Sequence, residues 1–320
     1  MRMKIKPIAF DSLGVRSMCT YINTDSIRIL IDPGVSLGRR YGKIPHPREY
    51  RQLKKKRKEI YEMADKTDLI IITHYHFDHY TPLGITDYLW TWTNPEEASQ
   101  IYQDKIVLIK DFKEKINMSQ RRRGWIFTKL LEKINCKVKI ADSKKLMYGD
   151  TTIKISDPVP HGEKGTPLGY VLMVEIESGD ERFLYSSDVQ GPICIKTRKI
   201  IEKEKPEMLI IGGPPTYLPQ IKRENIESAI KNMIKLSEKI PNIIVDHHLL
   251  RDVEWEKYIN MIKENCEHCK IQTAAENIGE TNMPLESLRN ILYEKDPPSN
   301  AFLKWSKLPY NKIKNTMPPI

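Results

Sequence analysis

The segment "LIIITHYHFDHYTP", from Leu69 to Pro82, constrains this chain more than any other stretch. Four apolar residues run directly into three histidines and an aspartate that are packed within six positions. An apolar run that ends at polar residues is typical of a strand covered on both faces. The sequence therefore predicts a buried strand whose end carries several side chains able to bind a metal ion.

These side chains form the pattern His-x-His-x-Asp-His, with His74, His76, Asp78 and His79 at its four positions. The first two histidines are two residues apart, so at a strand end they point the same way. Imidazole and carboxylate suit zinc, iron or manganese. Four ligands exceed what one tetrahedral centre usually takes from a single loop. We therefore expect two adjacent divalent transition-metal ions, zinc first, with iron or manganese as alternatives.

Short β-type runs recur along the rest of the chain, and amphipathic helical patterns lie between them. The runs include "IRILID", "IVLI", "RFLYSS", "EMLIIG" and "NIIVD". Apolar spacing predicts helices over residues 47–66, 111–135 and 223–239. Strands in the first half, interposed helices and strands again in the second half predict an α/β sandwich in one domain.

Further motifs follow in a fixed order around the histidine segment. They are Asp32 in "ILIDPG", His161 in "DPVPHG", Asp188 in "LYSSDVQGP", and His247 or His248 in "IIVDHHLL". Together with "THYHFDHYTP", this ordered set resembles the metallo-β-lactamase superfamily. The stretches "DSLGVRSMCTYI", "IDPGVSLGRRYGKIPHP" and "KINMSQRRRGW" look closest to an uncharacterised archaeal subgroup of it. The resemblance implies an αββα sandwich over residues 1–295, with a helical insertion at about 84–145 and a proline-rich, irregular tail at 296–320.

The resemblance also implies a division of the ligands between two metal ions. The first ion would be held by His74, His76 and His161, the second by Asp78, His79 and one late histidine, and Asp188 would bridge them. Asp78 and Asp188 are the residues expected to be catalytic, and Asp32 would orient a ligand histidine.

The sequence does not decide between His247 and His248 as the late ligand. Consecutive strand residues point to opposite faces, so we expect only one of the two to reach the metal. Asp246 would then steady the other histidine.

The net charge of +10 and the pI near 9.1 favour an anionic partner, although a lysine-rich, thermophile-like composition explains them equally well.

"KKKRK" at residues 54–58 reads as a solvated basic face of a helix. In "SQRRRGW", Arg121, Arg122 and Arg123 beside a tryptophan are candidates for gripping phosphate, with a helix cap or a lid as alternatives. Tyr217 in "GGPPTYLP" is a candidate to line a pocket.

Five cysteines are too few and too scattered for a disulfide framework, which favours a reducing compartment. Cys266 and Cys269 form a single C-x-x-C, which we interpret as two ordinary thiols rather than a structural zinc site. No apolar run approaches the roughly 20 residues needed to span a bilayer, and the start lacks a signal-peptide core. We expect a cytoplasmic protein without a membrane partner, and the oligomeric state stays open.

The resemblance implies metal-dependent hydrolysis by a metal-bound hydroxide at a dinuclear site. The first candidate substrate is a small ester, lactone or phosphoester. The second candidate function is an RNA or DNA phosphodiesterase, which the basic composition favours. The third is a non-enzymatic metal-binding protein on the same fold; the complete ligand set argues against it.

Overall fold

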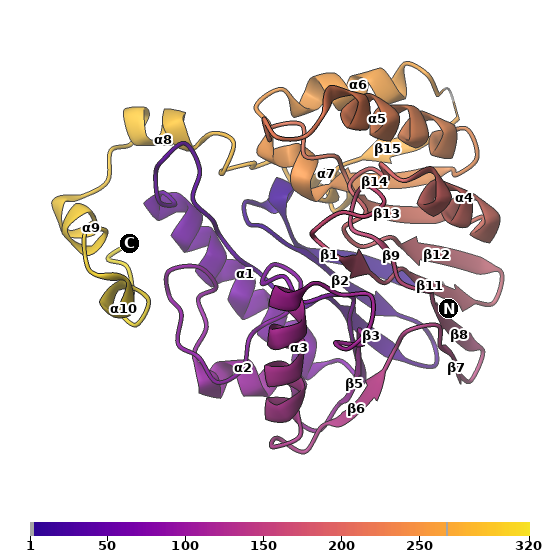
Figure 1. The fold of residues 1–320 in the computed structure, drawn as a ribbon, viewed down its shortest axis with the longest axis horizontal. Helices are drawn as coiled ribbons and strands as arrows, with labels where there is room; N and C mark the ends of the chain where they lie inside the picture. Colours follow the sequence, from indigo (N-terminus) through magenta and orange to yellow (C-terminus); the bar gives the residue numbers. More distant parts are fainter. Residues whose placement is uncertain (1–2, 267) are drawn as a thin grey trace.

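The computed structural model describes residues 3–266 and 268–320, and two β-sheets form its centre (Figure 1). The first sheet has the order β1-β2-β3-β4-β5-β6, with β1 to β3 antiparallel and β3 to β6 parallel. Its strands are β1 (Lys4–Phe10), β2 (Met18–Asn23), β3 (Arg28–Ile31), β4 (Leu69–Ile72), β5 (Ile106–Ile109) and β6 (Lys137–Ile140). The strand predicted before the histidine segment is therefore a parallel, interior strand of this sheet.

The second sheet has the order β15-β14-β13-β12-β11-β8-β7, with β7, β8, β11 and β12 antiparallel and β12 to β15 parallel. Its strands are β7 (Lys145–Tyr148), β8 (Thr151–Ile155), β11 (Val174–Ser178), β12 (Glu181–Tyr185), β13 (Met208–Gly212), β14 (Asn242–Asp246) and β15 (Lys270–Gln272). A small ribbon of β9 (Val159–Pro160) and β10 (Tyr170–Val171) lies apart from both sheets.

Helices cover the outer faces of the two sheets, as Figure 1 shows. On the first sheet they are α1 (Pro47–Asp65), α2 (Pro95–Tyr102) and α3 (Met118–Leu131), and on the second α4 (Ile195–Glu204), α5 (Arg223–Ser237) and α6 (Trp255–Lys263). The shorter ones are η1 (Asp11–Leu13), η2 (His247–Arg251), α7 (Ala274–Asn277), α8 (Arg289–Lys295), α9 (Asn300–Trp305) and α10 (Tyr310–Ile313). The predicted αββα sandwich is confirmed. Within the described residues, no helix has the length and apolar character needed to cross a bilayer.

Strand β4 shows why the run "LIII" had to be apolar throughout. Leu69 and Ile71 point into the core between the two sheets, whereas Ile70 and Ile72 pack against the helices outside the first sheet. All four side chains are fully buried. Alternate residues of β4 thus pack into two separate hydrophobic cores. This packing on both faces fixes the position at which the loop after Ile72 begins.

The helical insertion expected at about residues 84–145 contains strands as well as helices. Strands β5 and β6 extend the first sheet in parallel beside β4, and α2 and α3 are the crossovers that connect them. Parallel neighbours require such crossover connections, so this segment is built into the sandwich. The expectation of a mainly helical insertion was wrong for this reason.

The C-terminal segment is also more regular than expected, because α9 and α10 lie within residues 296–320. Phe302 and Trp305 are buried and pack against Tyr50 of α1 with ring centroids 5.9 and 5.4 Å away. Two aromatic anchors on one short helix dock the segment against the body, as α9 lies beside α1 in Figure 1.

The basic run at residues 54–58 is only partly a solvated face. Lys54, Lys55 and Lys58 are exposed, but Arg57 is buried. Its guanidinium donates to the carbonyls of Thr91 and Val35 at 2.7 and 3.1 Å. Arg57 therefore ties α1 to the loops beside the histidine segment.

The two cysteines of the C-x-x-C contact the chain as ordinary thiols. Cys266 Sγ lies 3.0 Å from the carbonyl oxygen of Ser237, and burial raises the pKa of Cys269 to about 12. Glu267, between them, lies outside the described residues. The Cys269 backbone amide donates to Cys266 Sγ at 3.2 Å.

Candidate metal site

The candidate ligands lie just beyond the carboxyl ends of parallel strands. Asp32 follows β3, the histidine segment follows β4, Asp188 follows β12, and His247 follows β14. In each sheet these strands run parallel, so their ends meet at one edge. His161 follows the short strand β9. Such an edge is where open α/β sheets place binding sites.

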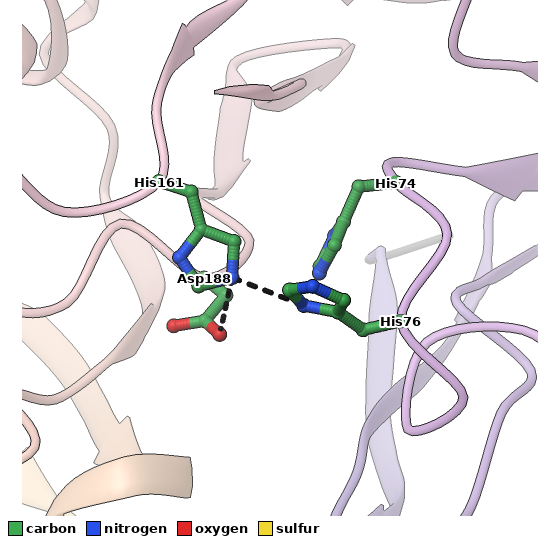
Figure 2. Close-up of side chains that lie close together, drawn as sticks. All are labelled: His74, His76, His161 and Asp188. Carbon is green, nitrogen blue, oxygen red and sulfur yellow. Dashed lines mark hydrogen bonds and ion pairs between the residues drawn. The ribbon is translucent and has the colours of Figure 1, made fainter. Parts of the chain in front are cut away.

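The first ligand group consists of His74, His76, His161 and Asp188, which each offer one ligand atom within 4.8 Å of the others. Figure 2 shows His74 and His76 facing His161 and Asp188 from opposite sides. His161 Nε2 lies 3.0 Å from Asp188 Oδ2 and 3.2 Å from His76 Nδ1. Among the described residues, His74 Nε2 and Asp188 Oδ1 are buried without a hydrogen-bond partner. A divalent ion suits this set, because it would satisfy both atoms.

The second ligand group consists of Asp78, His79 and His247. His79 Nε2 and His247 Nε2 are 3.4 Å apart, and Asp78 Oδ2 lies 3.8 Å from His247 Nε2. Asp188 Oδ2 is 3.4 Å from His247 Nε2, so this carboxylate lies between the two groups. The histidine segment thus contributes to both groups at once.

Asp32 is fully buried and supports the histidine segment without facing the site itself. Its Oδ2 lies 2.8 Å from His79 Nδ1 and accepts a 2.8 Å hydrogen bond from the Tyr185 hydroxyl. Its Oδ1 accepts from the Thr73 backbone amide at 2.8 Å. A Cβ on Gly34 would fall 2.2 Å from the backbone of the histidine segment, so only glycine permits this close approach of the two loops.

Both late histidines lie at the site, contrary to the expectation that their rings point apart. Strand β14 ends at Asp246, and His247 has a φ of 63° at the start of η2. The rings of His247 and His248 are therefore only 4.6 Å apart. His247 belongs to the second ligand group. It also forms a further candidate group with Asp188 and His248, whose Nε2 lies 3.0 Å from Asp188 Oδ2.

Asp246 does not have the role expected for it. Its carboxylate accepts from the backbone amides of Ser12, His247 and Ala274 at 3.0, 2.7 and 2.9 Å. It therefore fixes the backbone where the strand turns into η2, and burial raises its pKa to about 6. The side chain that orients the His247 ring is Asp11, whose Oδ2 lies 2.9 Å from His247 Nδ1.

Sequence reasoning missed Asp11 and two other residues that contact the ligands. Gln120 of α3 places its Nε2 3.3 Å from His76 Nε2. Arg251, the last residue of η2, places Nη2 3.3 Å from Asp78 Oδ2. No local pattern distinguished these side chains, since Gln120 precedes an arginine run and Arg251 is one basic residue among many.

Burial and charge set the protonation of the candidate ligands. Burial lowers the pKa of His76 to about 3 and that of His248 to about 4, so both imidazoles are neutral near pH 7. Burial opposes ionisation of Asp188, but His161 and the late histidines hold its pKa well below the usual range. Burial and Arg251 oppose protonation of His247, yet nearby carboxylates outweigh them and raise its pKa to about 10. A metal ion at His247 would therefore displace a proton.

The residues expected to contact substrate differ in their placement. The Tyr217 hydroxyl lies 3.2 Å from His248 Nδ1, at the edge of the site. Arg123 is already engaged, because it donates to the Tyr75 carbonyl at 3.2 Å and lies 4.4 Å from the centre of the Phe77 ring. Arg121 and Arg122 line an exposed groove on α3, in which Arg121 Nη2 donates to the Lys113 carbonyl at 2.8 Å.

Comparisons with known proteins agree with this fold. The profile of the Metallo-beta-lactamase superfamily matches residues 13–83. The metallo-beta-lactamase fold protein YhfI from Bacillus subtilis superposes with a TM-score of 0.52 at 14% identity, over 88% of this chain and 99% of that one. This protein therefore has the metallo-β-lactamase fold and carries a candidate His/Asp metal site.

Two archaeal relatives define the narrower family. The UPF0282 protein of Korarchaeum cryptofilum is 39% identical over 300 residues, which cover 92% of this chain and 96% of that protein. UPF0282 protein MJ1629 of Methanocaldococcus jannaschii is 41% identical over 290 residues, covering 90% and 95%. The chain belongs to the UPF0282 family, so the resemblance to an archaeal subgroup of the superfamily is confirmed.

Proposed function

We propose that this protein is a metal-dependent hydrolase that acts on a small ester, lactone or phosphoester. Divalent transition-metal ions, zinc first, would occupy the first and second ligand groups, with Asp188 between them. The observation that carries the proposal is that two atoms of the first group, His74 Nε2 and Asp188 Oδ1, are buried without a hydrogen-bond partner among the described residues. An unpaired buried polar atom costs about 1–3 kcal/mol, and a bound ion would remove that cost.

The chain's own residues would hold this chemistry in place. A bound divalent ion would polarise the bond to be cleaved and lower the pKa of a water molecule to about 7. Asp32 fixes the ring of His79 through Nδ1, and Asp11 fixes the ring of His247 in the same way. Both contacts leave Nε2 facing the site, as metal ligation requires. The Tyr217 hydroxyl beside His248 would contact the substrate.

Elemental analysis and a substrate panel test this proposal together. Purified protein should contain metal, and it should hydrolyse at least one ester, lactone or phosphoester. Removal of the metal with a chelator should abolish the activity, and zinc, manganese or iron(II) should restore it. Bound metal without hydrolysis across the panel would favour a non-enzymatic metal-binding protein, and a protein that binds no metal would refute both.

A second candidate function, cleavage of RNA or DNA, is favoured by the groove on α3. The groove has a volume of about 340 Å³ and is lined by Phe112, Lys113, Met118, Arg121, Arg122 and Trp125. Trp125 and Met118 are exposed, at 53% and 76%. Exposed cations beside an aromatic ring are the usual means of binding a single strand without sequence preference.

The salt dependence of binding tests the nuclease alternative. Each phosphate contact contributes about 0.7–0.9 to the slope of log affinity against log salt. The double variant Arg121→Gln/Arg122→Gln should flatten the slope for a single-stranded oligonucleotide by about 1.4–1.8 and leave metal content unchanged. Arg123→Gln is the matched control, since Tyr75 and Phe77 already engage this side chain. Weak, salt-independent binding by the wild type would exclude this function.

A further inference from the structure

Arg251 brings a guanidinium charge into direct contact with the second ligand group. The residue is only 3% exposed. Its Nη2 lies 3.3 Å from Asp78 Oδ2, and 3.2 and 3.5 Å from Nδ1 and Nε2 of His247, so it contacts two of the three residues of this group. In the first group, the corresponding contact to His76 comes from the neutral amide of Gln120. The two groups therefore differ in the charge of the side chain beside them.

The guanidinium is held in this position by other contacts. Arg251 Nε donates to Asp11 Oδ1 at 2.7 Å, and Nη1 lies 3.2 Å from His248 Nδ1. Asp11 in turn contacts His247 Nδ1 through its other oxygen. Burial opposes the charge on Arg251, but Asp11 together with Tyr217, Glu286 and Asp78 outweighs it and raises the pKa of Arg251 well above its usual range. The cation is thus both fixed and permanent at working pH.

We propose that Arg251 makes the two metal positions unequal, so that the first ligand group binds a divalent ion tightly and the second binds one with much lower affinity. An ion bound by Asp78 would lie close to the guanidinium, because Arg251 Nη2 is only 3.3 Å from Asp78 Oδ2. Like charges that lie close together repel strongly where solvent is excluded. An ion in the second position would also share the lone pairs of Asp78 and His247 with the guanidinium.

Asp11 partly counteracts the effect of the Arg251 charge on the second ligand group. Its carboxylate offsets part of the guanidinium charge and orients His247 for ligation. The Asp11–Arg251 pair would therefore set the affinity of the second position, without touching the first. This inference rests on the proposed metal centre and refines it from two equivalent ions to a tight ion and a weak one.

Calorimetric titration of metal-free protein with zinc tests the inequality. The wild type should bind in two steps whose Kd values differ by at least about 100-fold. Arg251→Met should tighten the second step by about 10- to 100-fold and leave the first unchanged. Arg28→Met is the matched control: Arg28 is paired with Asp68 at 2.6 Å, at the end of β3 away from Asp32, so its loss should change neither step.

Two further results keep the inference open to refutation. If Arg251→Met does not fold, Arg251→Gln removes the charge but keeps a side chain that can donate to Asp11, and it should still tighten the second step. Two binding steps of equal affinity in the wild type, or a second step that is unchanged in both variants, would refute the unequal affinities of the two groups. Neither result would refute the metal centre. A wild type that binds no zinc at all would overturn the metal centre and this inference with it.

Discussion

The two ligand groups share one loop and one bridging position, yet their surroundings differ. In the first group, His74 Nε2 and Asp188 Oδ1 have no hydrogen-bond partner among the described residues. In the second, Asp78 and His247 already contact the guanidinium of Arg251. The first group therefore has buried polar atoms without a partner in the described residues. In the second group, the guanidinium of Arg251 already contacts two of the candidate ligands.

The ligand set alone therefore does not determine how many metal ions bind tightly. Both groups are rich in histidine and carboxylate, and a ligand count would rate them as equals. The charge of the neighbouring side chain, neutral at Gln120 and positive at Arg251, separates them. The variant with the largest expected effect is one that removes a ligand from both groups.

The double variant His76→Ala/Asp78→Ala should have the largest effect, because it removes one ligand from each group. The wild type should saturate at about two zinc ions per chain, and the variant should retain almost none after dialysis. Elemental analysis measures this directly, and circular dichroism checks that the variant folds. Full metal content in the folded variant would contradict the assignment of both groups.

Asp188→Ala should reduce activity more than Asp32→Asn. Asp188 lies between the groups, at 3.0 Å from His161 Nε2 and 3.4 Å from His247 Nε2, so its loss affects both positions. Asp32 only supports His79 from behind. Loss of such a support costs about 10- to 100-fold, and removal of Asp188 should exceed that range. Hydrolysis of a responsive substrate by each variant gives the comparison; equal or reversed losses would refute these roles.

Arg57→Met should destabilise the protein without changing the chemistry of either group. The guanidinium donates to the carbonyls of Thr91 and Val35, and the variant would lose these buried hydrogen bonds. We expect a loss of about 2–3 kcal/mol in the free energy of unfolding, measured by denaturant titration. The exposed neighbour Lys55→Met is the matched control and should change it by less than about 0.5 kcal/mol. Similar values for the two variants would show that Arg57 does not brace the loops.

Gln120→Ala should give the smallest effect and should act on one group alone. The amide contacts His76 Nε2 at 3.3 Å and accepts from the Tyr75 amide at 2.9 Å, so it orients this ring from behind. Zinc affinity of the first group should fall by about tenfold, while the second step stays unchanged. A titration in which Gln120→Ala weakens both steps equally would show that the two groups are not independent.

The sequence predicted the local features of this site well. The run Leu69–Ile72 marked a strand buried on both faces, and the histidine segment directly behind it needed no tertiary information to be recognised. Helix α5 spans Arg223–Ser237 against a prediction of residues 223–239. Such features succeed because strand alternation, helical spacing and the adjacency of ligands within one loop are all properties of short segments.

Only the tertiary structure decided how the two groups are completed and surrounded. His247 and His248 are neighbours in sequence, and the turn from β14 into η2, with a positive φ at His247, brings both rings to Asp188. Asp11 reaches His247 across 236 positions of sequence, and Arg251 reaches Asp78 across 173. Contacts over such separations depend on how the two sheets pack, and no local pattern of residues encodes that packing.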